Sequence, residues 1–77
     1  MLGVSTVTGT QLRMARAGLE LTVRQVAEIA GVNLNTVHRI ERGHSAMHDT
    51  ILKIQSALEA QGVEFIADGV RIPPRQP

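Results

Sequence analysis

Apolar residues recur at helical spacing along the chain as far as residue 62, and at strand spacing after it. Leu12, Ala15 and Leu19 are three and four positions apart, so they share one face of a helix. Thr8 precedes Gln11 by three residues, which is the spacing of a capping box, where each side chain bonds to the other residue's backbone N–H. The pattern predicts a first helix that begins directly after Thr8.

A second, shorter helix is predicted after Thr22, because Thr22 and Gln25 repeat the capping pattern. Its apolar residues are Val26, Ala27 and Ala30. Gly31 should end this helix, since glycine readily adopts the left-handed backbone conformation that a sharp turn requires.

Asn33 can cap a third short helix, which Gly43 would close. Val37 and Ile40 lie one turn apart and should face inward. After a loop at residues 44–47, a fourth helix is expected. Its apolar stripe consists of Ile51, Ile54 and Leu58.

The periodicity changes after Gly62, where the fourth helix is expected to end. Two short apolar runs follow, Val63–Ile66 and Val70–Ile72, and the residues between them include Asp68-Gly69. Asp-Gly between such runs strongly favours a β-hairpin. Because an isolated two-stranded hairpin is marginally stable in water, it must pack on the helices or pair with another copy of the chain.

The outward face of the third helix carries side chains that can recognise nucleic-acid bases. Once Val37 and Ile40 face inward, the opposite stripe consists of Asn35, His38, Arg39 and Arg42, flanked by Leu34 and Thr36. Asn can pair with adenine, Arg with guanine, and Leu or Thr can contact a thymine methyl group. This helix is therefore a candidate for the major groove of DNA.

A solvated helix surface explains the same polar stripe equally well when the stripe is considered alone. The spacing of Ala27, Gly31 and Val37 favours the DNA-binding interpretation, because it fixes the angle between two helices as in a helix-turn-helix.

Arg16 and Glu41 are both expected on inner helix faces. Since each charge would be costly to bury alone, they are predicted to pair, the alternative being that each reaches solvent.

The segment from Gln11 to Gly43 resembles the DNA-binding domain of the λ repressor/Cro (XRE) class of bacterial and phage regulators. The residues that carry the resemblance are Leu21-Thr22, Val26-Ala27, Ala30-Gly31-Val32, Thr36-Val37, Arg39-Ile40-Glu41 and Gly43. The resemblance implies a mainly α fold, a compact bundle of about five short helices followed here by a short C-terminal β-hairpin or strand. It also implies a recognition helix at residues 33–42, the Arg16–Glu41 pair, and dimeric binding to palindromic operators.

The domain organisation expected on this basis has four parts. They are a flexible leader or short strand at 1–7, a helix-turn-helix DNA-binding domain at 8–62, a hairpin at 63–72 that can contribute to dimerisation, and a disordered tail at 73–77. The residues expected to contact DNA fall into two groups. Base contacts are assigned to Leu34, Asn35, His38 and Arg39, and contacts to the DNA backbone to Thr22, Arg24, Asn33, Thr36 and Arg42.

Two residues depart from the family pattern. Val23 occupies the first position of the second helix, where related proteins commonly have a glutamine that contacts a phosphate. Glu20 occupies a turn position where a small residue is frequent, and its charge near the DNA face is mildly unfavourable. Together with a net charge of only +1, these departures predict weak binding by a single copy and dependence on a homodimer.

The composition restricts the other possibilities. The 77 residues include no cysteine and one phenylalanine, so the core must be aliphatic and no disulfide can form. No membrane span and no secretory signal are expected, and the chain is expected to be cytoplasmic and nucleoid-associated. His38, His44 and His48 lack the additional ligands of a metal site, and no nucleophile has a positioned base. We therefore expect no enzyme activity and no cofactor.

The predicted function is a sequence-specific regulator of transcription, a repressor, that binds double-stranded DNA as a homodimer through helix 33–42. The alternative is an antitoxin or anti-activator that acts mainly by binding another protein. Leu52 and the hairpin edge are the candidate surfaces for a protein partner or for self-association. Leu52 could equally belong to the core.

Overall fold

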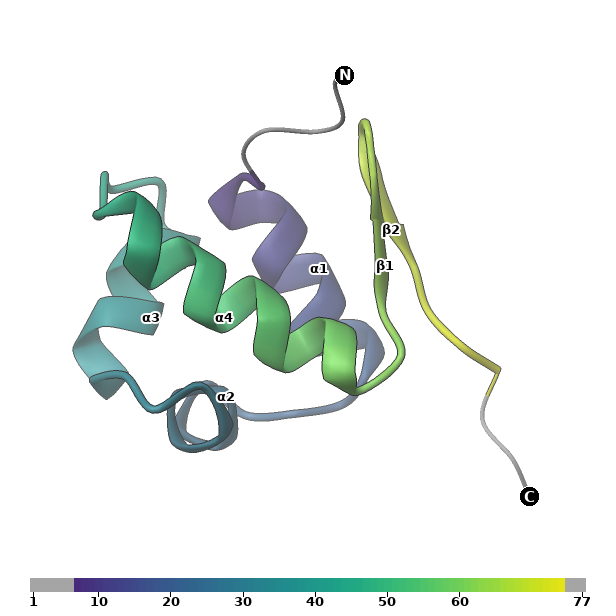
Figure 1. The fold of residues 1–77 in the computed structure, drawn as a ribbon, viewed down its shortest axis with the longest axis horizontal. Coiled ribbons are helices and arrows are strands. Elements are labelled where there is room, and N and C mark those ends of the chain that lie inside the picture. The colour runs from purple at the N-terminus through teal and green to yellow at the C-terminus, as the bar shows by residue number, and fades with distance from the viewer. Residues whose placement is uncertain (1–6, 75–77) are drawn as a thin grey trace.

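The computed structural model describes residues 7–74 (Figure 1). The elements in chain order are α1 (Gly9–Gly18), α2 (Val23–Ala30), α3 (Leu34–Glu41), α4 (His48–Ala60), β1 (Glu64–Ile66) and β2 (Gly69–Arg71). Residues 1–6 and 75–77, which include most of the expected leader and tail, lie outside the described residues.

The predicted helix starts are confirmed. The hydroxyl of Thr8 accepts a hydrogen bond from the backbone N–H of Gln11, and the Gln11 side chain accepts one from the N–H of Thr8. The same reciprocal pair joins Thr22 and Gln25 at the start of α2. Gly31 ends α2 with φ of 71° and ψ of 35°, the left-handed conformation that the turn into α3 was expected to need.

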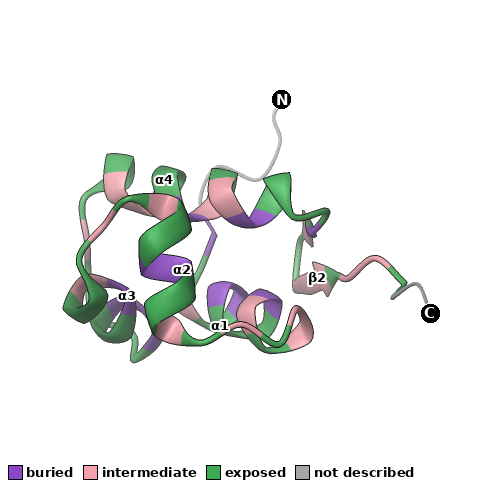
Figure 2. Ribbon diagram, turned by 90° about the horizontal axis from the view of Figure 1, so that it is seen from below, coloured by how far each residue is buried: buried purple, intermediate pink, exposed green. Residues whose placement is uncertain are grey.

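The aliphatic core lies between the helices, and Figure 2 shows the buried segments facing one another across the bundle. Its buried members are Val7, Leu12, Ala15, Val26, Ala27, Val37, Ile40, Ile54, Leu58 and Val63. Ala30 and Ile51 are partly buried at its edge. Leu52 is 39% exposed, so it points away from the core rather than into it.

A close approach of α1 to α3 depends on Gly9. A β-carbon at Gly9 would run into the carbonyl oxygen of Ile40, so only glycine allows the first turn of α1 to lie against the end of α3. This contact joins residues far apart in the sequence, and it orients α3 relative to the rest of the bundle.

The chain contains four helices in its described part, so the expectation of about five is wrong. The C-terminal segment forms the predicted antiparallel hairpin instead, with Phe65 opposite Val70 and Glu64 opposite Arg71. The two connecting residues are Ala67 and Asp68, since Gly69 already pairs with Ile66. The connection is therefore one residue shorter than the segment 67–69 that separates the two apolar runs in the sequence.

The side chain of Gln11 attaches the hairpin to α1. Its amide nitrogen donates to the carbonyl oxygens of Ile66, at 2.6 Å, and Gly69, at 3.1 Å. Gln11 is 4% exposed and uses its amide oxygen in the capping box, so one buried residue serves both elements.

None of the helices at residues 7–74 is long and apolar enough to cross a membrane.

Candidate nucleic-acid interface

The orientation of α3 follows from its buried face. Val37 and Ile40 are 1% and 3% exposed, and both belong to the core. Because successive residues of a helix are rotated by about 100°, this burial directs the opposite side chains to solvent. Asn35, His38 and Arg39 are exposed, as the sequence predicted.

The first turn of α3 is organised by Asn33. Its side-chain oxygen accepts a 2.7 Å hydrogen bond from the N–H of Asn35, and its backbone oxygen accepts from Thr36 and Val37. The capping interaction uses the oxygen of the Asn33 amide, so a contact of this side chain with DNA would use its NH₂ group. Leu34, the first residue of α3, is 37% exposed.

The N-terminus of α2 lies beside the N-terminus of α3. Val23, the first residue of α2, lines an open hollow together with three residues of the first turns of α3, namely Leu34, Asn35 and His38. Thr22 and Arg24 flank Val23 and are exposed. The hydroxyl oxygen of Thr22 accepts the capping bond, which leaves its proton able to reach a phosphate.

Thr36 and Arg39 lie on a different side of α3, next to the loop before α4. They line a second hollow with Ile40, Ser45, Ala46, Met47 and Thr50. Thr36 is half-buried, so its hydroxyl is less available than the sequence suggested. Arg42 forms the C-cap of α3 and is exposed.

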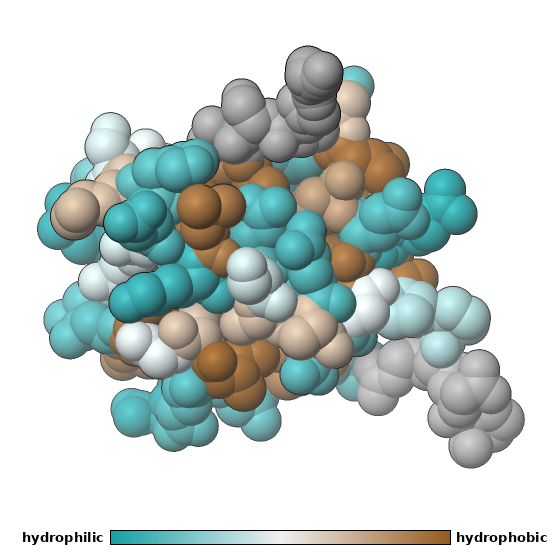
Figure 3. Space-filling view, in the orientation of Figure 1, coloured by the Kyte–Doolittle hydropathy of each residue, from teal (hydrophilic) through white to brown (hydrophobic). Residues whose placement is uncertain are grey.

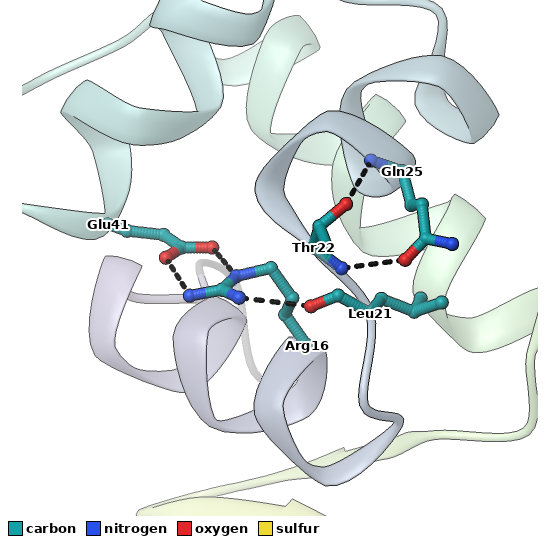
Figure 4. Close-up of polar contacts among 5 residues, drawn as sticks. All are labelled: Arg16, Leu21, Thr22, Gln25 and Glu41. Atoms are coloured by element: carbon teal, nitrogen blue, oxygen red, sulfur yellow. Dashed lines mark hydrogen bonds and ion pairs between the residues drawn. The ribbon is translucent and has the colours of Figure 1, made fainter.

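The predicted pair of Arg16 and Glu41 is confirmed, and Figure 4 shows its bidentate geometry. Nε of Arg16 donates to Oε2 of Glu41 at 2.8 Å, and a second guanidinium nitrogen donates to Oε1 at 3.0 Å. The third guanidinium nitrogen donates to the carbonyl oxygen of Leu21 at 3.0 Å. Hydrogen bonding to Glu41 raises the pKa of Arg16, and burial opposes that rise.

This ion pair positions the interface rather than forming part of it. The side chains of Arg16 and Glu41 are 21% and 7% exposed, and they join α1 to the last residue of α3. The bond to Leu21 adds the segment just before α2 (Figure 4). One guanidinium therefore joins α1, α3 and the segment before α2, and it helps to fix the orientation of α3.

The molecule presents an apolar groove on another face, between α2 and α4. It is lined by Ile29, Ala30, Asp49, Leu52, Lys53, Ser56 and Ala57. Ile29 and Leu52 are 46% and 39% exposed. Figure 3 shows hydrophobic side chains between polar ones on the face that carries α4.

Among residues 7–74, no three histidine or acidic side chains come together in a group that could hold a metal ion.

The sequence predicted the exposed residues of α3 but did not indicate that Val23 lines a hollow with some of them. From the sequence, Val23 represents only the loss of a phosphate-binding glutamine, whereas in the structure it lines the same surface hollow as Leu34. That Val23 and Leu34 line one hollow depends on the turn between α2 and α3, which sets the positions of the first residues of the two helices.

A family model described as a helix-turn-helix domain matches residues 8–65, which is more than half of the chain. Comparison with curated proteins gives no match, and comparison with solved structures gives none either. The matched span includes all four helices and the start of the hairpin.

Proposed function

The chain belongs to the helix-turn-helix domain family, and we propose that it is a sequence-specific regulator of transcription. In this proposal α3 enters the major groove of double-stranded DNA, and the regulator acts as a repressor in the cytoplasm by occupying its operator. Neither a chemical step nor a cofactor is part of the proposed mechanism.

The observation that carries the proposal is the presentation of Asn35 and Arg39 from a helix whose opposite face is buried. The two side chains have the donors and acceptors that match the major-groove edges of adenine and guanine. The contacts of α3 with the bundle fix this helix, so little ordering of the protein is needed on binding.

The contacts divide by their chemistry. Base contacts are assigned to Leu34, Asn35, His38 and Arg39. Contacts to the DNA backbone are assigned to Thr22, Arg24, Asn33, Thr36 and Arg42, together with the N–H groups at the starts of α2 and α3, which carry partial positive charge.

Selection of binding sites from random duplex DNA at stated salt tests the proposal. We expect a palindromic site with half-sites about 10 base pairs apart, centre to centre, because two recognition helices must be about 34 Å apart to enter successive major grooves. Recovery of no preferred sequence would contradict a specific regulator.

Alanine variants then locate the base contacts. Asn35→Ala and Arg39→Ala should each lower affinity for the selected duplex by about 1–3 kcal/mol and relax specificity at one position. Arg13→Ala is the matched control for Arg39→Ala, because Arg13 is exposed on α1, outside the proposed DNA contacts and the proposed dimer interface. Equal losses in Arg13→Ala and Arg39→Ala, measured by fluorescence anisotropy, would show that net charge rather than α3 governs binding.

A homodimer completes the proposal, since a single copy with this charge balance should bind weakly. The proposed interface combines α4 with the hairpin. Leu52 and Ile66 are exposed apolar residues on these elements, and Asp49 and Lys53 give the α4 groove both signs of charge, which suits a two-fold contact between identical surfaces.

The second candidate function is capture of another protein, as in an antitoxin or anti-activator. The apolar α2–α4 groove favours it, because an exposed groove of this kind can accept a partner helix. If the biological effect of the chain survives Asn35→Ala and Arg39→Ala, protein capture is the main activity. Loss of the effect in both variants supports DNA binding.

A further inference from the structure

The hollow between α2 and α3 differs from the rest of the recognition surface because its floor is apolar. Val23 and Leu34 are the first residues of their helices, and both line the hollow. Val23 is partly buried against the core, which fixes its position, whereas Leu34 is 37% exposed. The hollow encloses about 400 Å³ and opens to solvent.

Two polar side chains line the hollow beside this apolar floor. Asn35 and His38 follow on the same face of α3 and line the hollow beside Leu34. A base edge that enters here would meet two aliphatic side chains, and the neighbouring base would meet an amide and an imidazole. In the major groove, the aliphatic feature among the four bases is the C5-methyl group of thymine.

We propose that the Val23–Leu34 hollow is a thymine-methyl site, so that each half-site contains a thymine whose methyl group packs between these two side chains. The inference rests on the proposed function, because it requires α3 to enter the major groove. It assigns a specificity role to Val23, a residue outside the recognition helix. Asn35, which follows Leu34, then contacts the neighbouring base. The thymine contact and the Asn35 contact therefore require two adjacent base positions in the half-site.

Replacement of single thymines by deoxyuridine in the selected duplex tests the site, because it removes the methyl group and leaves the pairing intact. In each half-site there should be one thymine whose replacement by deoxyuridine lowers the affinity about fourfold. This factor is the one expected for burial of one methyl group. At the same position, 5-methylcytosine should bind about fourfold tighter than cytosine, since it restores the methyl group.

Protein variants test whether the preference for thymine over deoxyuridine arises in the hollow. In Val23→Ala and Leu34→Ala, the ratio of thymine to deoxyuridine affinity should shrink towards one. In Arg42→Ala, which removes a DNA-backbone contact, overall affinity should fall while the ratio stays near fourfold. The DNA substitution needs no change in the protein, so a variant that fails to fold does not remove the test.

The outcomes separate this inference from the proposed function. Specific binding that is sensitive to Asn35→Ala but indifferent to every deoxyuridine overturns the methyl site and leaves the function standing. Selected half-sites without thymine, or a fourfold effect that persists in both Val23→Ala and Leu34→Ala, also overturn it. A chain that selects no duplex overturns both.

Discussion

Glu41 ends α3 with a carboxylate that is almost fully buried, and both of its oxygens accept hydrogen bonds from Arg16. Removal of one partner leaves the other charge uncompensated, which is far more costly than exchange of both for apolar residues. Arginine is charged throughout the neutral range, and hydrogen bonding to Glu41 raises the pKa of Arg16 further.

Arg16→Met should therefore lower the free energy of unfolding by about 3 kcal/mol, because it isolates the Glu41 carboxylate. The double variant Arg16→Met with Glu41→Leu should recover most of that loss. Urea denaturation followed by circular dichroism measures both. A double variant no more stable than Arg16→Met would show that the pair contributes more than mutual neutralisation.

Two glycines should respond to alanine for different reasons. Gly31→Ala meets no neighbouring atom within 4 Å, so only its left-handed backbone opposes the change, at about 1 kcal/mol. Gly9→Ala forces a β-carbon into the Ile40 carbonyl and should cost about 2–3 kcal/mol, although alanine normally favours a helix. Thermal unfolding of the two variants measures which one loses more stability. A larger loss for Gly31→Ala than for Gly9→Ala would contradict this account.

At the level of elements, sequence reasoning succeeded where the determinant is local. The capping pairs at Thr8 and Thr22 and the turn at Gly31 need only neighbouring residues, so all three were predictable. The hairpin was predictable as well, although its connection is one residue shorter than the segment 67–69 between the two apolar runs. The hydrogen bonds that Gln11 donates to Ile66 and Gly69 cross 55 and 58 positions of sequence, and no local pattern could have indicated them.

The candidate site divides in the same way. The exposed stripe of α3 follows from helical geometry once Val37 and Ile40 are buried, so Asn35, His38 and Arg39 could be named in advance. The hollow at Val23 and Leu34 requires the angle between two helices and could not. The expectation of about five helices came from family resemblance and was wrong, since residues 7–74 contain four helices and the segment after Gly62 forms the hairpin predicted from its own pattern.

Thr22 caps α2 and is also a proposed DNA contact, and two substitutions can separate these two roles. Thr22→Ala removes the hydroxyl that accepts from Gln25 and should cost about 1 kcal/mol of stability. Thr22→Asn retains a capping oxygen, so it should restore stability while displacing any contact of the hydroxyl with phosphate. Comparison of unfolding midpoints with duplex affinity for the two variants decides whether Thr22 contacts DNA.

At the scale of the whole molecule, a net charge of only +1 leads us to expect that the proposed DNA binding depends more on dimerisation than on phosphate attraction. Leu52→Glu should dissociate the proposed dimer, because it places a charge in the apolar groove between α2 and α4. Leu34→Glu is the matched control, since Leu34 is similarly exposed (37%, against 39% for Leu52) but lies on the recognition surface. Sedimentation at tens of micromolar should show that only Leu52→Glu becomes monomeric, and a wild-type monomer would refute the dimer.

The central claim is that α3, held outward by its buried face, is the surface that meets DNA. A titration of isotope-labelled protein with the selected duplex, followed by NMR, locates the contact surface directly. The largest shifts should fall on the amides of residues 22–25 and 33–42. Shifts centred on Ile29 and Leu52, with those of α3 unchanged, would contradict the account.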